Sequence, residues 1–378
     1  SIRRTRVKWS IFSLWNFLDF TKHQHKHSLN KESCPPINLE VLILEGVFIF
    51  SSRVMQNAQV GEAARSAEFI LVYGASGWIG SQMVEILKQH KELKQQGVQI
   101  ISASSRLENF SSVLSEFKEY HKPPHSKVIR VINCAGKTGR PNVDWCETHK
   151  HETLQANLMG AIHLASICDM HNVHLTHFGT GCMYTYNDKF PQPPHEYSAS
   201  SDHPAVKESD PITFTGSFYS KTKATAEEYI KEYPACLILR LRMPISDDLH
   251  PRSLLTKLLK YEKVVNIPNS MSILHDLLPI AVEMSFRGLS GVYNFTNPGY
   301  ITHNQLLSKY KQYIDPTFTW KNFTEEEQNQ ILLAPRSNTF LDTSKLETLF
   351  PSLLPIDHSL DLLFSRMKVI QDEQARNK

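Results

Sequence analysis

The sequence predicts an α/β fold, a Rossmann-type doubly wound parallel sheet with a smaller carboxyl-terminal substrate lobe. Short continuous apolar runs alternate with helical segments from about residue 67, glycines follow the first run, and prolines punctuate the chain after about residue 245. The chain has 378 residues, of which 41% are hydrophobic. This is enough to bury a sizeable core, and it excludes a disordered or collagen-like chain.

Strands and helices are expected to alternate along the first part of the chain. Apolar runs of the length of buried strands occupy residues 69–73, 98–103, 128–133, 173–178 and 236–241. Helical segments occupy residues 81–93, 109–120, 152–170 and 219–232. Because right-handed crossovers join parallel strands, helices should cover both faces of the sheet. We therefore expect a Rossmann domain over residues 67–245 and a mainly substrate-binding lobe over residues 246–370.

Residues 1–66 mix basic and apolar pieces without sustained periodicity, and we expect a poorly ordered leader there. This segment carries nine basic and five acidic side chains, whereas the remaining chain is near neutral, so its charge does not predict nucleic-acid binding. The six scattered cysteines favour a reduced compartment, and no apolar run approaches the roughly 18 residues of a membrane span. We expect a cytoplasmic protein that binds neither nucleic acid nor membrane and holds no metal.

A glycine-rich turn with the spacing GxxGxxG follows the first expected strand. Glycines let the backbone approach a pyrophosphate, and the N–H groups at the start of the next helix bind the anion. The turn predicts a dinucleotide site, with tight strand-to-helix packing as the alternative. The residues expected to contact the cofactor are Gly74, Ser76, Gly77, Trp78, Ile79 and Gly80.

The end of the second expected strand indicates which dinucleotide binds. Residues 103–106 read Ala-Ser-Ser-Arg, with no carboxylate for a ribose hydroxyl and one arginine for a 2′-phosphate. This composition favours NADPH over NADH, with Ser104 and Arg106 as contacts. An inward-turned Glu108 and a merely solvated Arg106 are the alternatives.

Tyr219 and Lys223 open a helical segment and, four residues apart, share one face. A lysine ammonium beside a phenol lowers the pKa of the phenol, which makes the tyrosine an acid and base near neutrality. The YxxxK pattern alone is common by chance, but downstream of the glycine-rich turn it resembles the catalytic pair of short-chain dehydrogenases/reductases. The resemblance implies a hydroxyl from the preceding strand, and Thr180 supplies it.

Cys182 stands two residues beyond Thr180, where sugar-nucleotide dehydratases carry an Asp-Glu pair. The placement resembles GDP-fucose synthase, whose cysteine moves protons at carbons next to a ketone. A small, buried apolar cysteine is the alternative interpretation.

Longer motifs resemble the nucleotide-rhamnose synthases, bifunctional epimerase-reductases that make UDP- or dTDP-β-L-rhamnose from the 4-keto-6-deoxy-glucose nucleotide. These motifs occupy residues 136–147, 214–224, 242–246, 261–265, 267–271, 294–299 and 317–324. Residues 334–338 and 341–345 also resemble dTDP-4-dehydrorhamnose reductases. The similarity covers roughly residues 68 to 365 and does not extend into the leader.

The resemblance implies an epimerisation pair that matches Cys182 and Lys257, and a reductase triad that matches Thr180, Tyr219 and Lys223. Further cofactor contacts are expected at Cys134, Ala135, Gly136, Met243, Pro244 and Ile245. The candidates for binding the nucleotide sugar are Thr138, Gly139, Arg140, Asn142, Asn269, Arg336 and Asn338. One departure is Ser104, which replaces an arginine of plant members and leaves the 2′-phosphate to Arg106.

The implied protein is therefore an enzyme, a 3,5-epimerase and NADPH-dependent 4-reductase. Carbons 3 and 5 flank the 4-ketone, so their hydrogens can be removed if donors such as Thr180 and Tyr219 stabilise the enolate oxygen. The alternatives are a nucleotide-sugar reductase without epimerase activity and a non-catalytic Rossmann regulatory subunit, such as that of methionine adenosyltransferase. A homodimer through residues 152–170 and 219–232 is expected by analogy. The sequence leaves open UDP against dTDP and which of Cys182 and Lys257 acts at which carbon.

Overall fold

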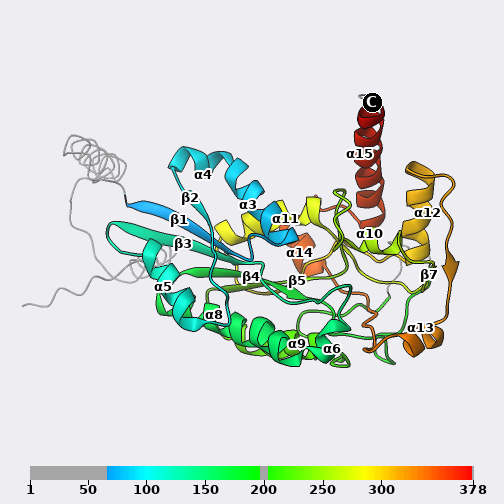
Figure 1. Cartoon of the computed structure of the whole chain (residues 1–378), viewed down its shortest axis with the longest axis horizontal. Helices are drawn as coiled ribbons and strands as arrows, with labels where there is room; N and C mark the ends of the chain where they lie inside the picture. The colour runs from blue at the N-terminus through cyan, green and yellow to red at the C-terminus, as the bar shows by residue number, and fades with distance from the viewer. Residues whose placement is uncertain (1–65, 196–202, 377–378) are drawn as a thin grey trace, which may run out of the picture. The chain divides into compact units, whose positions relative to one another are not determined.

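The structure, a computed structural model, describes residues 66–195 and 203–376 (Figure 1). The leader predicted over residues 1–66 lies outside the described residues except for Ser66. No helix in the described ranges is long and apolar enough to cross a membrane.

Six parallel strands form the central sheet, in the order β2-β1-β3-β4-β5-β9. They are β1 (Ala67–Tyr73), β2 (Gln99–Ser102), β3 (Ser126–Asn133), β4 (His174–Thr180), β5 (Cys236–Leu241) and β9 (Gly291–Asn294). The five predicted strands are confirmed, and β9 is an addition. The order reverses between β1 and β3, and ligands of open α/β sheets bind at such a switch point, outside the carboxyl ends of the strands.

Helices cover both faces of this sheet, as predicted (Figure 1). On one face lie α3 (Trp78–Gln89), α4 (Lys91–Gln96), α11 (Leu274–Phe286) and α14 (Ser344–Leu349). On the other face lie α5 (Phe110–Tyr120), α8 (Gly160–Met170) and α9 (Phe218–Ile230). The fold is therefore the Rossmann-like α/β arrangement that the sequence predicts.

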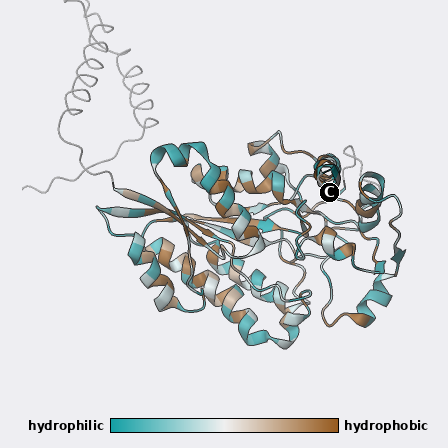
Figure 2. Cartoon of the chain, turned by 45° about the horizontal axis from the view of Figure 1, so that its top comes forward, coloured by the Kyte–Doolittle hydropathy of each residue, from teal (hydrophilic) through white to brown (hydrophobic). Residues whose placement is uncertain are grey.

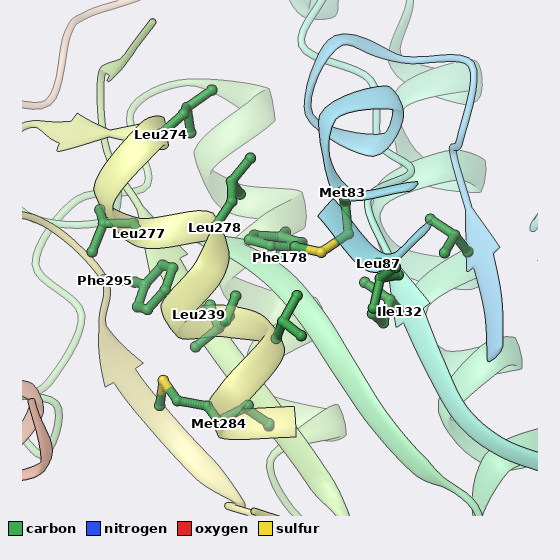
Figure 3. Packing of buried hydrophobic residues seen from close by; sticks show 14 of the residues in the cluster. Met83, Leu87, Ile132, Phe178, Leu239, Leu274, Leu277, Leu278, Met284 and Phe295 are labelled. Carbon is green, nitrogen blue, oxygen red and sulfur yellow. The ribbon is translucent and has the colours of Figure 1, made fainter. Parts of the chain in front are cut away.

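Apolar side chains from helices and strands interlock between these layers. Met83 and Leu87 of α3 pack with Ile132 of β3 and Phe178 of β4, and Leu277 of α11 belongs to the same buried cluster (Figure 3). Figure 2 shows predominantly hydrophobic strands between helices whose outer surfaces carry hydrophilic residues. Each large apolar side chain buried in this way stabilises the fold by about 2 kcal/mol.

Two predicted helices are interrupted. The segment predicted over residues 81–93 divides at His90, whose extended backbone (φ −63°, ψ 118°) separates α3 from α4. The segment predicted over residues 152–170 contains α7 (Lys150–Leu154), a π-helical turn (Gln155–Met159) and α8. Such π turns are frequent at functional sites.

The buried Asn157 in the π turn grips the backbone of the loop after β3. Its Oδ1 accepts a hydrogen bond from the Lys137 N–H at 2.7 Å, and its Nδ2 donates to the Lys137 carbonyl at 2.8 Å. This helix therefore orders the loop that leaves the switch point.

Shorter elements after β5 form a further core of their own, which includes side chains of α10, α12 and α15. These elements are β6 (Pro244–Ile245), α10 (Leu254–Leu258), β7 (Lys263–Val264), β8 (Ser272–Ile273), α12 (His303–Tyr313), β10 (Lys321–Asn322), α13 (Glu325–Ile331) and α15 (Ile356–Arg376). The division at residue 245 stays a prediction. The sheet extends across it, because β9 pairs with β5 while α11 and α14 cover the sheet.

Candidate active site

The glycine-rich turn brings the start of α3 against the ends of β1 and β3. Gly74 has φ +74°, and a Cβ there would lie 2.5 Å from the Ala135 nitrogen; a Cβ at Gly80 would lie 2.1 Å from the Gly74 carbonyl oxygen. Gly77 is the N-cap, and within the described part of the chain no side chain caps α3. The N–H groups of its first turn are thus left for an anion, which fits the pyrophosphate of a dinucleotide.

The side chain of Trp78 joins this turn to the segment after β6. Its Nε1 donates a hydrogen bond to Asp248 Oδ2 at 2.7 Å, and its ring stacks on His250 with 5.2 Å between centroids. Met243, between β5 and β6, has φ +43°, a strained backbone for a methionine of the kind that clusters at ligand sites. The cofactor residues predicted after β3 and β5 therefore stand at the same sheet edge as the turn.

The end of β2 carries a carboxylate that the sequence analysis missed. Glu116 of α5 accepts hydrogen bonds from the Ser104 N–H at 2.7 Å, the Ser104 hydroxyl at 2.9 Å and the Ser105 N–H at 3.1 Å. Arg106 and Glu108 are both exposed. The acid at this strand end comes from twelve residues further along the chain rather than from Glu108, so local composition did not reveal it.

Thr180, Cys182 and Tyr219 are brought together at the end of β4. Thr180 Oγ1 accepts a hydrogen bond from the Cys182 N–H at 3.1 Å, and Thr180 is also hydrogen-bonded to the Tyr219 hydroxyl. Burial raises the pKa of Tyr219, the nearby Cys182 adds to the rise, and the hydrogen bond to Thr180 opposes it. The phenol is therefore protonated near neutral pH.

Lys223 reaches the strand beside it rather than the phenol. Its Nζ donates a hydrogen bond to the Phe178 carbonyl at 3.1 Å and lies 3.2 Å from His177 Nε2. Burial lowers the pKa of Lys223 to about 8, and Glu227 opposes this shift. The expectation that Lys223 lowers the pKa of Tyr219 is wrong for this structure, because burial raises that pKa and the ammonium is engaged by β4.

His177 is the middle of a buried hydrogen-bonded chain. Asn133 Oδ1 accepts from the Ala135 N–H at 2.9 Å, so the Asn133 amide group faces His177 Nδ1, at 2.9 Å, as a donor. Burial and then the Lys223 charge lower the pKa of His177, so the ring is neutral.

Arg242 is a site residue that the sequence analysis missed, although the motif over residues 242–246 begins with it. The side chain is 1% exposed, and its Nη1 lies 3.5 Å from Cys182 Sγ. It also donates hydrogen bonds to Ser337 Oγ at 3.0 Å and to Asn269 Oδ1. The prediction that Asn269 binds the nucleotide sugar is not supported, because this fully buried side chain holds Arg242 instead.

Lys257, on α10, lies in a group of cations. Burial lowers its pKa, and the charges of Arg252 and Arg336 lower it further. The sequence analysis missed Arg252, which donates a hydrogen bond to Thr138 Oγ1 at 3.0 Å. Burial and then the charge of Arg140 lower the pKa of Arg252. Four predicted residues therefore lie near one another and near the newly found Arg252: they are Thr138, Arg140, Lys257 and Arg336.

Four of the residues predicted to bind the sugar nucleotide also make local contacts in this structure. Arg336 forms an ion pair with Asp144 at 2.7 Å, and Asn142 Oδ1 accepts a hydrogen bond from the Asp144 N–H at 2.8 Å. Gly139 has φ +70°, and Asn338 Oδ1 accepts from Asn269 Nδ2 at 3.0 Å. One carboxylate therefore holds Arg336 and the loop after β3 together at the edge of the cation group.

The active helix α9 is held in place from both ends. Glu147 Oε1 accepts from the Phe218 N–H at 2.7 Å at the start of the helix. Near the other end of the helix, Glu227 forms a buried ion pair with Arg240 of β5, with 2.5 Å between Glu227 Oε1 and Arg240 Nη2. Such fixed ends keep Tyr219 in register with β4.

Fold and site together define an α/β protein with a dinucleotide turn and a Thr-Cys-Tyr cluster at the switch edge. Residues 70–244 match the NAD dependent epimerase/dehydratase family. A bifunctional dTDP-4-dehydrorhamnose 3,5-epimerase/dTDP-4-dehydrorhamnose reductase of Arabidopsis thaliana is 47% identical over 306 residues, which are 79% of this chain and 93% of the relative. The crystal structure of the L780 UDP-rhamnose synthase from Acanthamoeba polyphaga mimivirus is 36% identical with a TM-score of 0.69, covering 79% of this chain and 98% of that one.

The chain belongs to the NAD dependent epimerase/dehydratase family and, within it, to the branch of nucleotide-rhamnose epimerase-reductases. A trifunctional UDP-glucose 4,6-dehydratase/UDP-4-keto-6-deoxy-D-glucose 3,5-epimerase/UDP-4-keto-L-rhamnose-reductase of A. thaliana is 48% identical over 291 residues. The match covers 77% of this chain but 40% of that relative, so the chain spans less than half of the trifunctional protein.

Proposed function

We propose that the chain is a bifunctional 3,5-epimerase and 4-reductase that converts UDP- or dTDP-4-keto-6-deoxy-glucose to the L-rhamnose nucleotide with NADPH. The observation that carries the proposal is the meeting of Thr180, Cys182 and Tyr219 at the end of β4. A relative that is 47% identical and nearly the same length as the matched region is named for both reactions.

The hydroxyls of Thr180 and Tyr219 would bind the oxygen of the 4-ketone. Two donors aimed at one oxygen stabilise the enolate that forms when a proton leaves carbon 3 or carbon 5. The bound cofactor would supply a hydride to carbon 4. Because the pKa of Tyr219 is raised, its phenol is protonated and has a proton to give to the same oxygen during reduction. One arrangement of donors therefore serves both reactions.

Cys182 and Lys257 would exchange the protons of epimerisation from opposite sides of the sugar ring. The Arg242 guanidinium, whose Nη1 lies 3.5 Å from the Cys182 sulfur, would hold that sulfur in position for the proton exchange. The lowered pKa of Lys257 increases the share of free amine at neutral pH. One group would remove a proton from its face, and the other, in its protonated form, would return a proton from the opposite face.

The cations around Lys257 would bind the nucleotide diphosphate. Arg140 lies in the loop after β3, and Arg252 lies in the loop after β6. Arg336 lies between α13 and α14, and its charge acts on Lys257 together with that of Arg252. Arginine binds phosphate in a bidentate manner, and grouped cations attract a dianion more strongly than one does. This placement supports a substrate that carries a diphosphate close to the reacting sugar.

A nucleotide-sugar reductase without epimerase activity is the second candidate. The observation that favours it is the position of Lys257 among arginines that would serve the diphosphate equally well. This candidate keeps the roles of Thr180 and Tyr219 and gives Cys182 none.

The two candidates are separated by incubating the chain with UDP-4-keto-6-deoxy-glucose and NADPH in deuterated water. We expect the rhamnose product to carry deuterium at carbons 3 and 5. Cys182→Ala should lose exchange at one or both carbons, and Tyr219→Phe should lose reduction but keep some exchange. Cys236→Ala, which changes a buried cysteine of β5, is the matched control.

Reduction without any deuterium at carbons 3 and 5 would leave only the reductase, and retained double exchange in Cys182→Ala would remove that residue from the mechanism. Repeating the experiment with the dTDP substrate compares the two nucleotides.

We also propose that the protein forms a homodimer through α8 and α9 and works in the cytoplasm. Met170 on α8 and Tyr229 on α9 are 57% and 59% exposed, which gives these helices an apolar surface. The five cysteines within the described ranges are all free, as in a reducing compartment. Light scattering of the wild type and of Tyr229→Glu tests the dimer, which the substitution should weaken.

A further inference from the structure

The carboxylate of Glu116 occupies a set of donors at the end of β2. Two backbone N–H groups and one hydroxyl point at it, all within 3.1 Å. Glu116 and Ser105 are half-buried and Ser104 is exposed, so the two donors of Ser104 lie at the surface. An anion-binding site is thus present at this strand end, and a side chain of the protein fills it.

This position is the one at which a Rossmann fold contacts the adenosine ribose of its dinucleotide. β2 is the neighbour of β1, and the glycine-rich turn leaves the end of β1 at Gly74. Glu116 also acts on the last residue of β1, because burial and then the Glu116 charge raise the pKa of Tyr73. The carboxylate therefore faces the ends of both strands that flank the predicted dinucleotide site.

A carboxylate at this point treats the two dinucleotides differently. The 2′-hydroxyl of NADH can donate a hydrogen bond to it, while the Ser104 and Ser105 donors stay in place. The 2′-phosphate of NADPH carries negative charge and needs the same donors, so it must displace Glu116 or lie beside it at a Coulombic cost. Arg106, the one cation of residues 103–106, is exposed and can offset part of this cost.

We propose that Glu116 is a specificity-determining residue for the cofactor: its carboxylate receives the ribose 2′-hydroxyl of NADH and weakens the binding of the NADPH 2′-phosphate. The inference rests on the part of the proposed function that assigns a nicotinamide dinucleotide to the chain. It makes NADH a competent cofactor and narrows the preference for NADPH that residues 103–106 indicate.

Direct binding of NADPH and NADH to the full chain, without substrate, tests the proposal. We expect Glu116→Gln to bind NADPH about fivefold to tenfold more tightly than the wild type does, because the substitution removes the negative charge of the carboxylate that would repel the 2′-phosphate. NADH affinity should stay equal or fall. Glu119→Gln, on the same helix and exposed, is the matched control and should change neither affinity. Isothermal titration calorimetry at one fixed ionic strength provides the four dissociation constants.

Unchanged or weaker NADPH binding by Glu116→Gln would overturn the proposal. Glu116→Ala guards against a glutamine that keeps the same hydrogen bonds, and it should also shift the NADPH to NADH ratio toward NADPH. A thermal melt of each variant shows that it is folded. If neither dinucleotide binds to the wild type, the inference and the dinucleotide part of the proposed function both fail. If the affinities shift as expected but deuterium exchange and reduction are absent, only the proposed reaction fails.

Discussion

Arg242 Nη1 lies 3.5 Å from Cys182 Sγ, on a guanidinium that is almost completely buried. Its other partners in the described residues are oxygens of Gly181, Asn269 and Ser337, and no carboxylate is among them. A buried cation is costly without a counter-charge. The contact with the Cys182 sulfur therefore couples the burial of Arg242, just after β5, to the chemistry at the end of β4.

Replacing Arg242 should therefore affect the proton exchange assigned to Cys182 more strongly than it affects cofactor binding. We expect Arg242→Gln to reduce deuterium exchange at carbons 3 and 5 at least tenfold, because the Cys182 sulfur loses the donor that positions it, and to change the rate at which iodoacetamide alkylates Cys182. The lost hydrogen bonds should also lower the free energy of unfolding by about 2–4 kcal/mol. Peptide mapping after alkylation identifies the thiol.

Ser337→Ala, which removes one acceptor and keeps the guanidinium, is the control for that experiment. It should alkylate nearly as fast as the wild type. A folded Arg242→Gln protein with the wild-type alkylation rate would show that the guanidinium does not position the sulfur.

Lys223 should make the stability of the protein depend on pH. Its pKa is about 8 in the folded chain, below its ordinary value of 10.5, so the unfolded chain binds more protons between these values. The free energy of unfolding therefore rises with pH from about 8 to about 10.5, by at most about 3 kcal/mol from this group. Below pH 8 the lysine is charged in both states, and this gain is absent.

Urea denaturation of the wild type and of Lys223→Met across this pH range measures the contribution of Lys223. The difference between the two curves removes the effect of other titrating groups. Lys223→Met should be the more stable protein at pH 7 and should lose reduction. Parallel pH curves for the two proteins would contradict the lowered pKa.

Arg252 should contribute to binding the nucleotide substrate. The Arg252→Ala change removes one cation from the group around Lys257 and the hydrogen bond to Thr138. We expect KM for the 4-keto substrate to rise about tenfold with little change in kcat, because a diphosphate contact is present in both the ground and transition states. Initial-rate kinetics at low and high salt check this expectation. Arg287→Ala, at a largely exposed pair with Glu283, should leave KM unchanged; a larger effect on kcat than on KM would place Arg252 in the chemistry.

Gly80→Ala should disrupt the dinucleotide turn. The added Cβ would lie 2.1 Å from the Gly74 carbonyl oxygen, so either α3 or the turn must move. We expect a loss of about 2–4 kcal/mol in the free energy of unfolding and at least tenfold weaker NADPH binding. Gly77→Ala, whose Cβ would meet the same oxygen at 3.1 Å, is the milder control. Equal effects of the two substitutions on binding would argue against the close approach as the cause.

Much of this protein could be predicted because the signals are local. The five strands β1 to β5 are apolar runs, and the turn from Gly74 to Gly80 is one short motif. Thr180 and Cys182 lie on one strand end, which places them together in any register. The helix of Tyr219 follows from its own periodicity. The strand β9 was not predicted because only Val292 and Tyr293 of its four residues are apolar, so no apolar run marks it.

The chain by itself determined the Rossmann-like sheet, the dinucleotide turn and the closeness of Thr180 and Cys182, since periodicity and short spacings act within single elements, whereas the meeting of these two residues with Tyr219 was expected only from the family resemblance. Only the tertiary structure decided that Glu116 fills the end of β2, that His177 engages Lys223 and that Arg242 meets Cys182. These partners lie 12, 46 and 60 residues apart. Contacts over such distances arise from the packing of different elements, and burial then sets the charge states of the groups involved, so neither property can be read from the neighbours of a residue in sequence.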